Sequence, residues 1–138
     1  ESMPCLSYTN AAATQINFVE KVFSTLGKVA VIDEKLMEAA TVLGACGIAY
    51  AMRFIRANMQ GGIEIGFDVA TAGLSVEQTV KGAAELLLQK GTHPEQEIDK
   101  VTTPKGCTIV GLNEMEHQGF SSSLIKGIAV SYQKIAKN

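Results

Sequence analysis

Three threonines, a proline and a glycine are gathered in residues 101–108, which read Val-Thr-Thr-Pro-Lys-Gly-Cys-Thr and directly precede a helical pattern. The proline fixes its own φ and biases Thr103 towards an extended backbone, while Gly106 lets a ligand approach the main chain closely. The amides of Cys107 and Thr108 then begin a helix, where free N–H groups attract an anion. The segment predicts a pocket for a small carboxylate. The alternative is an ordinary loop in which a threonine caps its own helix.

Helical periodicity dominates the chain, and the predicted fold class is all-α, a bundle of about six to seven helices. Apolar residues recur at three- and four-residue steps along most of the sequence. Only residues 28–32 have the β-branched character of an extended segment, after which Asp33 can cap a helix that begins near Glu34. Breaks in the helical pattern are expected at residues 45–47 and at Gly61–Gly62.

The longest predicted helix covers residues 67–90 and ends at Gly91. Alanine and glycine recur along it, so a neighbouring helix can pack unusually close to its backbone. Close packing of this kind suits a subunit interface. We therefore expect this helix to form the seam of a dimer.

Composition limits the classes of function. The 138 residues suit one domain, and 46% hydrophobic with 19% charged residues indicates a globular chain. A net charge of −2 gives no electrostatic case for nucleic acid, and no apolar run reaches the roughly 20 residues that span a bilayer. We expect neither nucleic acid nor a membrane as a partner.

Cysteine and histidine usage is equally restrictive. The three cysteines lie far apart in the sequence, which favours a reducing, cytoplasmic location over a disulfide framework. Cys107 has no histidine beside it, which favours a packing role over that of a nucleophile. His93 and His117 have no partner at ligand spacing, so no metal site is expected.

Several motifs in the same order resemble those of the pyrroline-5-carboxylate reductases. Residues 101–109 are similar to the family pattern Val-Thr/Ser-Ser/Thr-Pro-Gly-Gly-Thr/Ala-Thr, and residues 78–84, Gln-Thr-Val-Lys-Gly-Ala-Ala, match a family helix. Residues 47–50, Gly-Ile-Ala-Tyr, resemble the end of the family loop Ser-Gly-Ser-Gly-Pro-Ala-Tyr. The resemblance extends over about residues 27–135.

The resemblance implies reduction of 1-pyrroline-5-carboxylate to L-proline with NADP or NAD as the cofactor. It places Thr103 and Thr108, with the amides from Gly106 through Cys107, on the carboxylate of this cyclic imino acid. It places Thr41 near the imine nitrogen as a proton donor or hydrogen-bond partner. For Thr41 the alternative is a helical threonine whose hydroxyl bonds back to the preceding turn.

The cofactor-facing loop implied by the family consists of Gly44, Ala45, Cys46 and Gly47. Here the chain departs from the family pattern, because two serines and the following proline are lost. Lys105 also replaces a family glycine. Its side chain could add a cation near the carboxylate or narrow the entrance, and the sequence does not choose between them.

No Gly-x-Gly-x-x-Gly turn occurs in the chain, so it lacks the phosphate-binding element of a dinucleotide-binding (Rossmann) domain. We expect residues 1–138 to be a single helical substrate-binding and dimerisation domain of a two-domain reductase, with residues 1–10 as a junction and the dinucleotide-binding domain upstream. Alone it should be inactive, and in the protein it should form a homodimer or a ring of dimers. The alternatives are a related two-domain reductase of another imine or keto acid, and a free-standing helical dimerisation or ligand-binding module.

Overall fold

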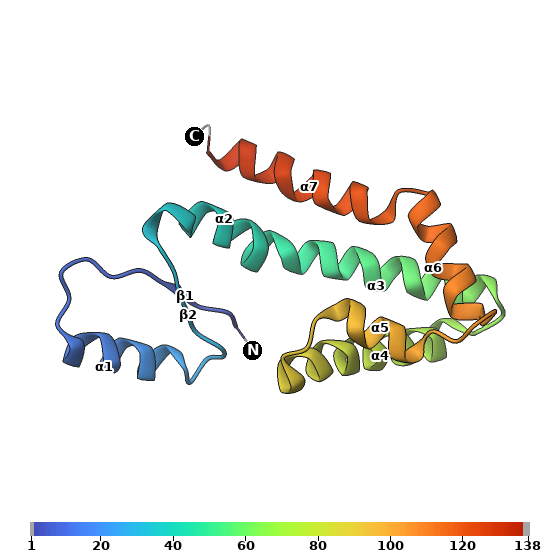
Figure 1. Ribbon diagram of the computed structural model, residues 1–138, viewed down its shortest axis with the longest axis horizontal. Coiled ribbons are helices and arrows are strands. Elements are labelled where there is room, and N and C mark those ends of the chain that lie inside the picture. The colour runs from blue at the N-terminus through green and yellow to red at the C-terminus, as the bar shows by residue number, and fades with distance from the viewer. Residues whose placement is uncertain (1, 137–138) are drawn as a thin grey trace. The chain divides into compact units, whose positions relative to one another are not determined.

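The computed structural model describes residues 2–136, and most of these residues are helical (Figure 1). The all-α fold class is therefore confirmed. The described chain contains seven α-helices and one pair of two-residue strands. In order, these elements are β1 Cys5–Leu6, α1 Ala13–Phe23, β2 Ala30–Val31, α2 Met37–Thr41, α3 Gly47–Glu64, α4 Val69–Lys90, α5 Pro94–Val101, α6 Cys107–His117 and α7 Phe120–Ile135.

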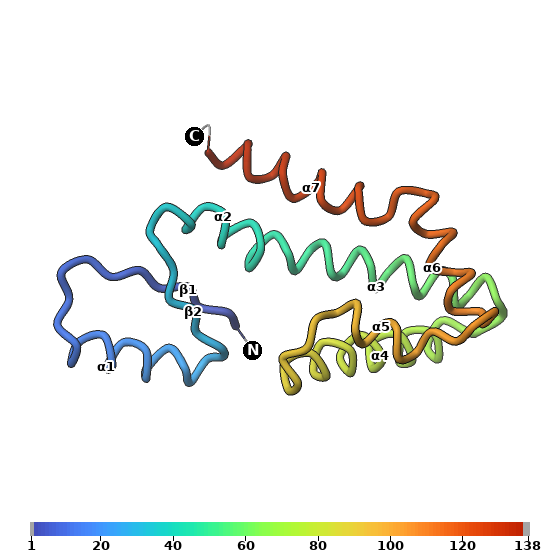
Figure 2. Tube along the Cα trace, viewed as in Figure 1, coloured from blue at the N-terminus to red at the C-terminus, as the bar shows by residue number. Residues whose placement is uncertain are grey.

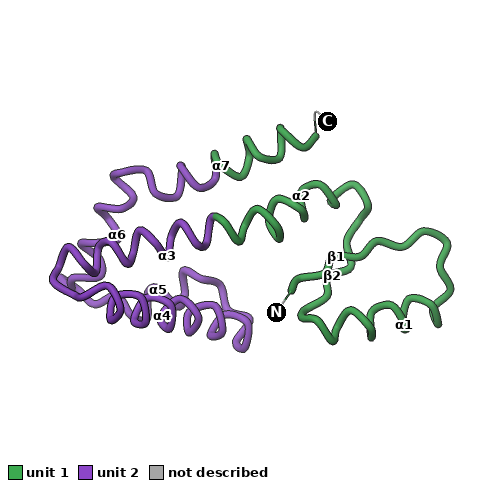
Figure 3. Tube along the Cα trace, turned by 180° about the vertical axis from the view of Figure 1, so that it is seen from behind, with its two compact units in different colours: residues 1–49, 126–138 green, residues 50–125 purple. Residues whose placement is uncertain are grey.

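Contacts divide the chain into two compact units (Figure 3). The first unit comprises residues 1–49 and 126–138, and the second comprises residues 50–125. Both divisions fall inside helices, α3 and α7, so each of these helices contributes to both units. The two units are described separately below.

In the first unit, β1 and β2 form a parallel pair that is joined by α1 (Figure 2). The Ala30 amide donates to the Pro4 carbonyl at 3.0 Å, and the Ile32 amide donates to the Leu6 carbonyl at 2.9 Å. Parallel neighbours need a crossover connection, and α1 supplies it. The extended character predicted for residues 28–32 is therefore confirmed, whereas the segment expected as a junction contains a paired strand.

A continuous helical stretch follows from Glu34 to Glu64. It consists of a 3₁₀ turn capped by the Asp33 carboxylate, then α2, a π-helical turn at Val42–Cys46, and α3. The break expected at residues 45–47 is wrong, because the backbone widens into the π turn instead of ending. The family pattern has a proline at the position of Ile48. Because isoleucine, unlike proline, has a backbone N–H, this position can donate a hydrogen bond within the helix.

This helical stretch is long and apolar enough to cross a bilayer, judged by length and composition alone, with 6% of its most apolar window buried. The core helix of a soluble protein meets the same criteria. The expectation of no membrane partner therefore remains a prediction.

In the second unit, α3 and α4 pack closely through small residues. A Cβ at Gly62 would lie 3.3 Å from the Ala72 Cβ, and a Cβ at Gly73 would lie 3.3 Å from the Met59 methyl. Ala72 is 2% exposed. The helix end expected at Gly61–Gly62 is therefore wrong, since α3 continues to Glu64 and uses a glycine for this contact. Two of the small residues of α4 serve packing within the chain.

Helix α4 is the longest, with 22 residues, as the sequence predicts. The Asp68 carboxylate accepts from the amides of Ala70 and Thr71 at its start, and Gly91 ends it with φ +63°. The next helix, α5, is anchored by Glu97, whose carboxylate accepts from the Thr92 hydroxyl and from the Lys100 ammonium, both at 2.7 Å. These contacts fix the helix that leads into residues 102–106.

Candidate functional site

Residues Thr103 to Gly106 form a tight turn immediately before α6. The Gly106 amide donates to the Thr103 carbonyl at 2.9 Å, with a proline at the second position and φ +60° at Lys105, the third. Positive φ at this position is the geometry of a type II turn, which favours glycine there. The positive φ thus explains why the family has a glycine at the position that Lys105 occupies here.

Gly106 has a different reason for being a glycine. Its φ of −72° is open to any residue. A Cβ there would clash with the Thr103 hydroxyl oxygen, so only glycine fits this turn as it stands. The sequence predicts that a ligand approaches the backbone at Gly106, whereas the close neighbour that the structure shows there is the Thr103 side chain of the same turn.

Helix α6 begins at Cys107, as expected, and no side chain caps its start. The first turn also lacks an acidic residue. The alternative of a threonine that caps its own helix is therefore not what the structure has. The Gly106 amide is already used within the turn, so the outward donors are the amides of Cys107 and Thr108, which have no partner in the helix itself. The Thr103 and Thr108 side chains are both exposed beside them.

Thr41 lies on a pocket of about 350 Å³ in the first unit. Gly44 and Ala45 line the same pocket, so three residues that the sequence predicts for the site are brought together there. Cys46 and Gly47 complete the π turn and are half-buried. The remaining lining residues, which sequence reasoning missed, are Met3, Cys5, Met37 and Ala40.

The Thr41 hydroxyl donates to the Met37 carbonyl one turn back at 2.9 Å. The back-bonded arrangement considered as an alternative is thus present. With its proton engaged in this way, the hydroxyl group retains its capacity to accept a hydrogen bond.

Gly44 leaves open space at the pocket. An added Cβ would meet no atom of the described chain within 4 Å. Glycine in a helix costs about 1 kcal/mol relative to alanine, so this position carries a cost that packing within the chain does not explain. A flat group can lie directly against this backbone, which suits the aromatic end of a cofactor.

The missed residues had a weak sequence signal. Met37 precedes Thr41 by four residues, so helical spacing puts it on the same face, whereas the immediate neighbour Ala40 has no such signal. Cys5 begins β1 and Met3 lies two residues before it, and only the pairing of β1 with β2 brings them to this helix. Pairing between segments so far apart is not readable from local pattern.

The predicted site residues therefore fall into two groups. Thr41 and residues 44–47 belong to the first unit, and residues 103–108 belong to the second. Among residues 2–136, no group of three or more His, Cys, Asp or Glu side chains is placed to hold a metal ion.

Comparison with known proteins gives consistent matches. Residues 34–138 match the family model described as pyrroline-5-carboxylate reductase dimerisation. The chain is 49% identical over 148 aligned residues to pyrroline-5-carboxylate reductase 1 of Dictyostelium discoideum, covering 99% of this chain and 27% of that protein. It is 38% identical to the pyrroline-5-carboxylate reductase of Synechocystis, covering 87% of this chain and 45% of that protein.

Solved structures give the same result. A pyrroline-5-carboxylate reductase from Coxiella burnetii superposes with a TM-score of 0.93 at 25% identity, over 98% of this chain and 51% of that one. The Plasmodium falciparum pyrroline carboxylate reductase, solved with NADP bound, gives 0.82 at 28% identity, over 95% and 51%. The chain thus spans about half the length of the solved relatives and less than half of these two curated ones.

Proposed function

Because this chain belongs to the pyrroline-5-carboxylate reductase dimerisation family, we propose that the full-length protein reduces 1-pyrroline-5-carboxylate to L-proline with NADPH or NADH. The observation that carries the proposal is the start of α6. The family match includes this helix, and its first amides are left without a side-chain cap where a carboxylate would sit. The cofactor, when bound, supplies the hydride to the imine carbon.

The substrate carboxylate binds at the start of α6 in this proposal. The Cys107 and Thr108 amides and the Thr103 and Thr108 hydroxyls are its donors. A carboxylate here also interacts favourably with the helix dipole. Holding the ring by its carboxylate fixes which face of the imine is presented for reduction.

Residues Gly44, Ala45, Cys46 and Gly47 hold the reactive end of the cofactor. The open Cβ position at Gly44 supports this assignment, because a planar ring fits where a side chain would otherwise project. The half-buried residues Cys46 and Gly47 then support the backbone from behind.

Thr41 acts on the imine nitrogen in this proposal. Its hydroxyl proton is engaged by the Met37 carbonyl, so the oxygen is free to accept a hydrogen bond from a protonated imine N–H. Protonation makes the imine carbon a better hydride acceptor. Of the two roles that the resemblance allows, the geometry therefore favours the hydrogen-bond partner.

The parallel strand pair bears on domain organisation. Residues 2–33 precede the segment matched by the family model. A pair of two-residue strands is marginal on its own, and a β-α-β unit is the building block of dinucleotide-binding sheets. We place β1, α1 and β2 at the end of such a sheet, and residues 34–138 in the helical domain. The isolated chain is then inactive.

A homodimer, or a ring of dimers, follows from the dimerisation family. A reducing, cytoplasmic location fits the three cysteines, all of which are free.

The proposal is tested by following NADPH or NADH oxidation by the full-length protein with 1-pyrroline-5-carboxylate and identifying L-proline as the product. Replacing Thr108 by Val should raise KM for the imine while leaving the KM for the cofactor near its original value. Thr79→Val is the matched control, because the Thr79 hydroxyl only bonds back to the Ser75 carbonyl within α4. An unchanged KM in Thr108→Val would remove the carboxylate assignment.

Gly44→Ala tests the cofactor assignment. The added methyl fits the chain and favours the helix by about 1 kcal/mol, so the variant should be at least as stable as the original protein. If a cofactor ring lies on this backbone, the KM for the cofactor rises. Unchanged cofactor binding would show that the space at Gly44 is not used.

A second candidate is a related reductase that acts on a different cyclic imine or keto acid. Lys105 favours it, because this exposed cation stands one residue before the α6 N-cap, where the family has glycine. Comparing kcat/KM for 1-pyrroline-5-carboxylate with kcat/KM for other imines and keto acids separates the two candidates. Absence of any reductase activity in the full-length protein would favour the free-standing module.

A further inference from the structure

Lys105 is the only charged residue between Lys100 and Glu114, and it stands one residue before the N-cap of α6. Its side chain is exposed and forms no ion pair or hydrogen bond within the part of the chain that the structure describes. The Cys107 and Thr108 amides follow it in the sequence. An unpaired cation therefore stands beside the donors that the proposed function assigns to the substrate carboxylate.

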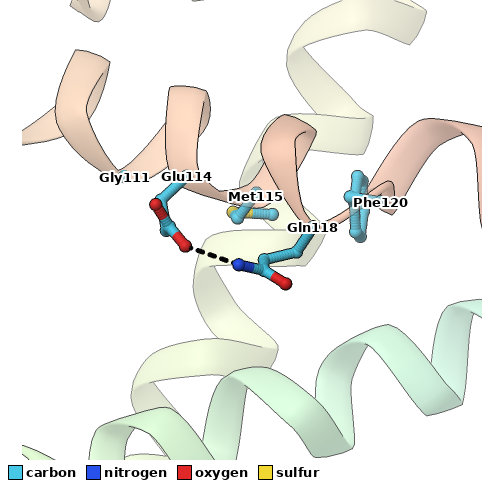
Figure 4. Close-up of a pocket in the computed structure, with 5 residues that line it drawn as sticks. All are labelled: Gly111, Glu114, Met115, Gln118 and Phe120. Carbon is cyan, nitrogen blue, oxygen red and sulfur yellow. Dashed lines mark hydrogen bonds between the residues drawn. The ribbon is translucent and has the colours of Figure 1, made fainter.

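The acidic side chains of α5 and α6 do not neutralise this cation. The Glu97 carboxylate is engaged by two lysines of α4 and α5, at 3.8 Å and 2.7 Å, and Asp99 forms no ion pair with Lys105. In α6 the Glu114 carboxylate accepts from the Gln118 amide at 2.8 Å (Figure 4). The positive charge of Lys105 is thus left for a group that does not belong to these two helices.

The position of Lys105 is unfavourable for a lysine in two ways. Its φ of +60° disfavours any residue with a Cβ. The start of a helix also carries partial positive charge, which repels a cation and favours an acidic residue. Helices α4 and α5 follow this preference, with Asp68 at the N-cap of α4 and Glu95 in the first turn of α5. A bound anion would compensate for the electrostatic cost at Lys105.

The lysine side chain is long enough to meet such an anion. Consecutive Cα atoms are about 3.8 Å apart, so the Cα atoms of Lys105 and Cys107 are at most about 7.6 Å apart. The ammonium group sits on a flexible four-carbon stem and carries a full charge, whereas the amides and hydroxyls of the site offer only dipoles. At physiological salt this charge acts over about 8 Å.

We propose that Lys105 is a specificity-determining residue that selects imines carrying a carboxylate over imines of the same ring that lack one. The proposal rests on the proposed reductase activity and adds a selection by charge to its carboxylate site. Because the attraction is electrostatic, it acts mainly on KM and is screened by salt.

Steady-state kinetics of the full-length protein with 1-pyrroline-5-carboxylate and with the carboxylate-free 1-pyrroline test the proposal. Lys105→Gln removes the charge and keeps a side chain at the same backbone position. We expect kcat/KM for 1-pyrroline-5-carboxylate to fall by about 3- to 5-fold, the effect expected of one exposed ion pair, and to do so through KM. The value for 1-pyrroline should not change. Lys105→Arg keeps the charge and should preserve the selectivity.

Lys81→Gln is the matched control, because it removes the same charge from the middle of α4, where Lys81 is also exposed. It should leave both kcat/KM values unchanged. Added KCl should lower kcat/KM for 1-pyrroline-5-carboxylate in the original protein and should lower it less in Lys105→Gln.

The outcomes separate this proposal from the one on which it rests. An equal fall in kcat/KM for both imines, or no fall for either, would overturn charge selection by Lys105 and leave the reductase activity standing. An equal effect of Lys81→Gln would overturn it too, since net charge alone would then explain the result. No turnover of either imine by the original protein would refute the reductase activity and the role of Lys105 with it.

Discussion

Helices α4 and α6 begin in opposite ways. At the start of α4 the Asp68 carboxylate accepts from two backbone amides at 3.0 Å, which satisfies donors that every helix leaves free. At the start of α6 no side chain does this, and a tight turn holds the chain so that the following amides face outward. The start of α4 is closed by its own sequence, whereas the start of the helix proposed to bind an anion is left open.

The largest effect on stability is expected from Gly106→Ala, which distorts the turn that precedes the uncapped start of α6. The new Cβ would clash with the Thr103 hydroxyl oxygen, so the turn must shift. Overpacking of this kind costs about 1–3 kcal/mol of unfolding free energy, measurable by urea denaturation. In a Thr103→Ala background the cost should shrink, because the contacting oxygen is gone. Equal costs in both backgrounds would show that this contact does not determine the glycine.

The second-largest effect is expected from Asp68→Ala, which removes the side-chain cap at the start of α4. Loss of the carboxylate leaves the Ala70 and Thr71 amides without their acceptor, and we expect Tm to fall by several degrees. Asp68→Asn keeps an acceptor oxygen and should retain most of the stability. The contrast with α6 fails if Asp68→Ala leaves Tm unchanged.

A smaller change of opposite sign is expected from Lys105→Gly. The left-handed conformation costs a residue with a Cβ roughly 1–2 kcal/mol, and the greater flexibility of glycine in the unfolded chain offsets part of the gain. The unfolding free energy should therefore rise by about 0.5–1 kcal/mol. A decrease would show that the Lys105 side chain makes a stabilising interaction.

The smallest effect on stability is expected from lowering the pH. Hydrogen bonds from Thr71 lower the pKa of Asp68, and the Lys100 ammonium, followed by the Thr92 hydroxyl, lowers the pKa of Glu97. Carboxyls with a lowered pKa in the folded state contribute stability that is complete above their ordinary pKa values of 3.8 and 4.5 and is lost as the pH falls through the folded values. Thermal unfolding measured from pH 7 to pH 3 should show a fall in Tm that is confined to the most acidic part of this range. In Glu97→Gln, the fall in Tm between pH 7 and pH 3 should be smaller.

Many helix starts and ends can be predicted from the sequence because they depend on residues close together in the chain. The N-cap at Asp33, the positive φ at Gly91 and the start of α6 at Cys107 each follow from residues within one turn. Motifs in residues 101–109 and 78–84 were enough to find the family.

The helix ends predicted from the sequence are wrong at two places, where contacts and backbone geometry outweigh the local pattern. Gly62 does not end α3, because its missing side chain makes room for Ala72 of α4. Residues 45–47 do not break the chain either, since the π turn carries the helix past them and the Gly47 amide donates to the Val42 carbonyl. At Val42, which is 1% exposed, burial holds this stretch in place.

By itself the sequence determined the helical character of the protein, the order of its helices, its family and the threonines and glycines that mark its candidate site, because periodicity, caps and short motifs act over a few residues. Only the tertiary structure decided that Met3 and Cys5 share a pocket with Thr41, that Thr103 fills the space beside Gly106, and that Gly44 and Gly111 face open space. These facts depend on which backbones approach one another, and local pattern does not encode such distances.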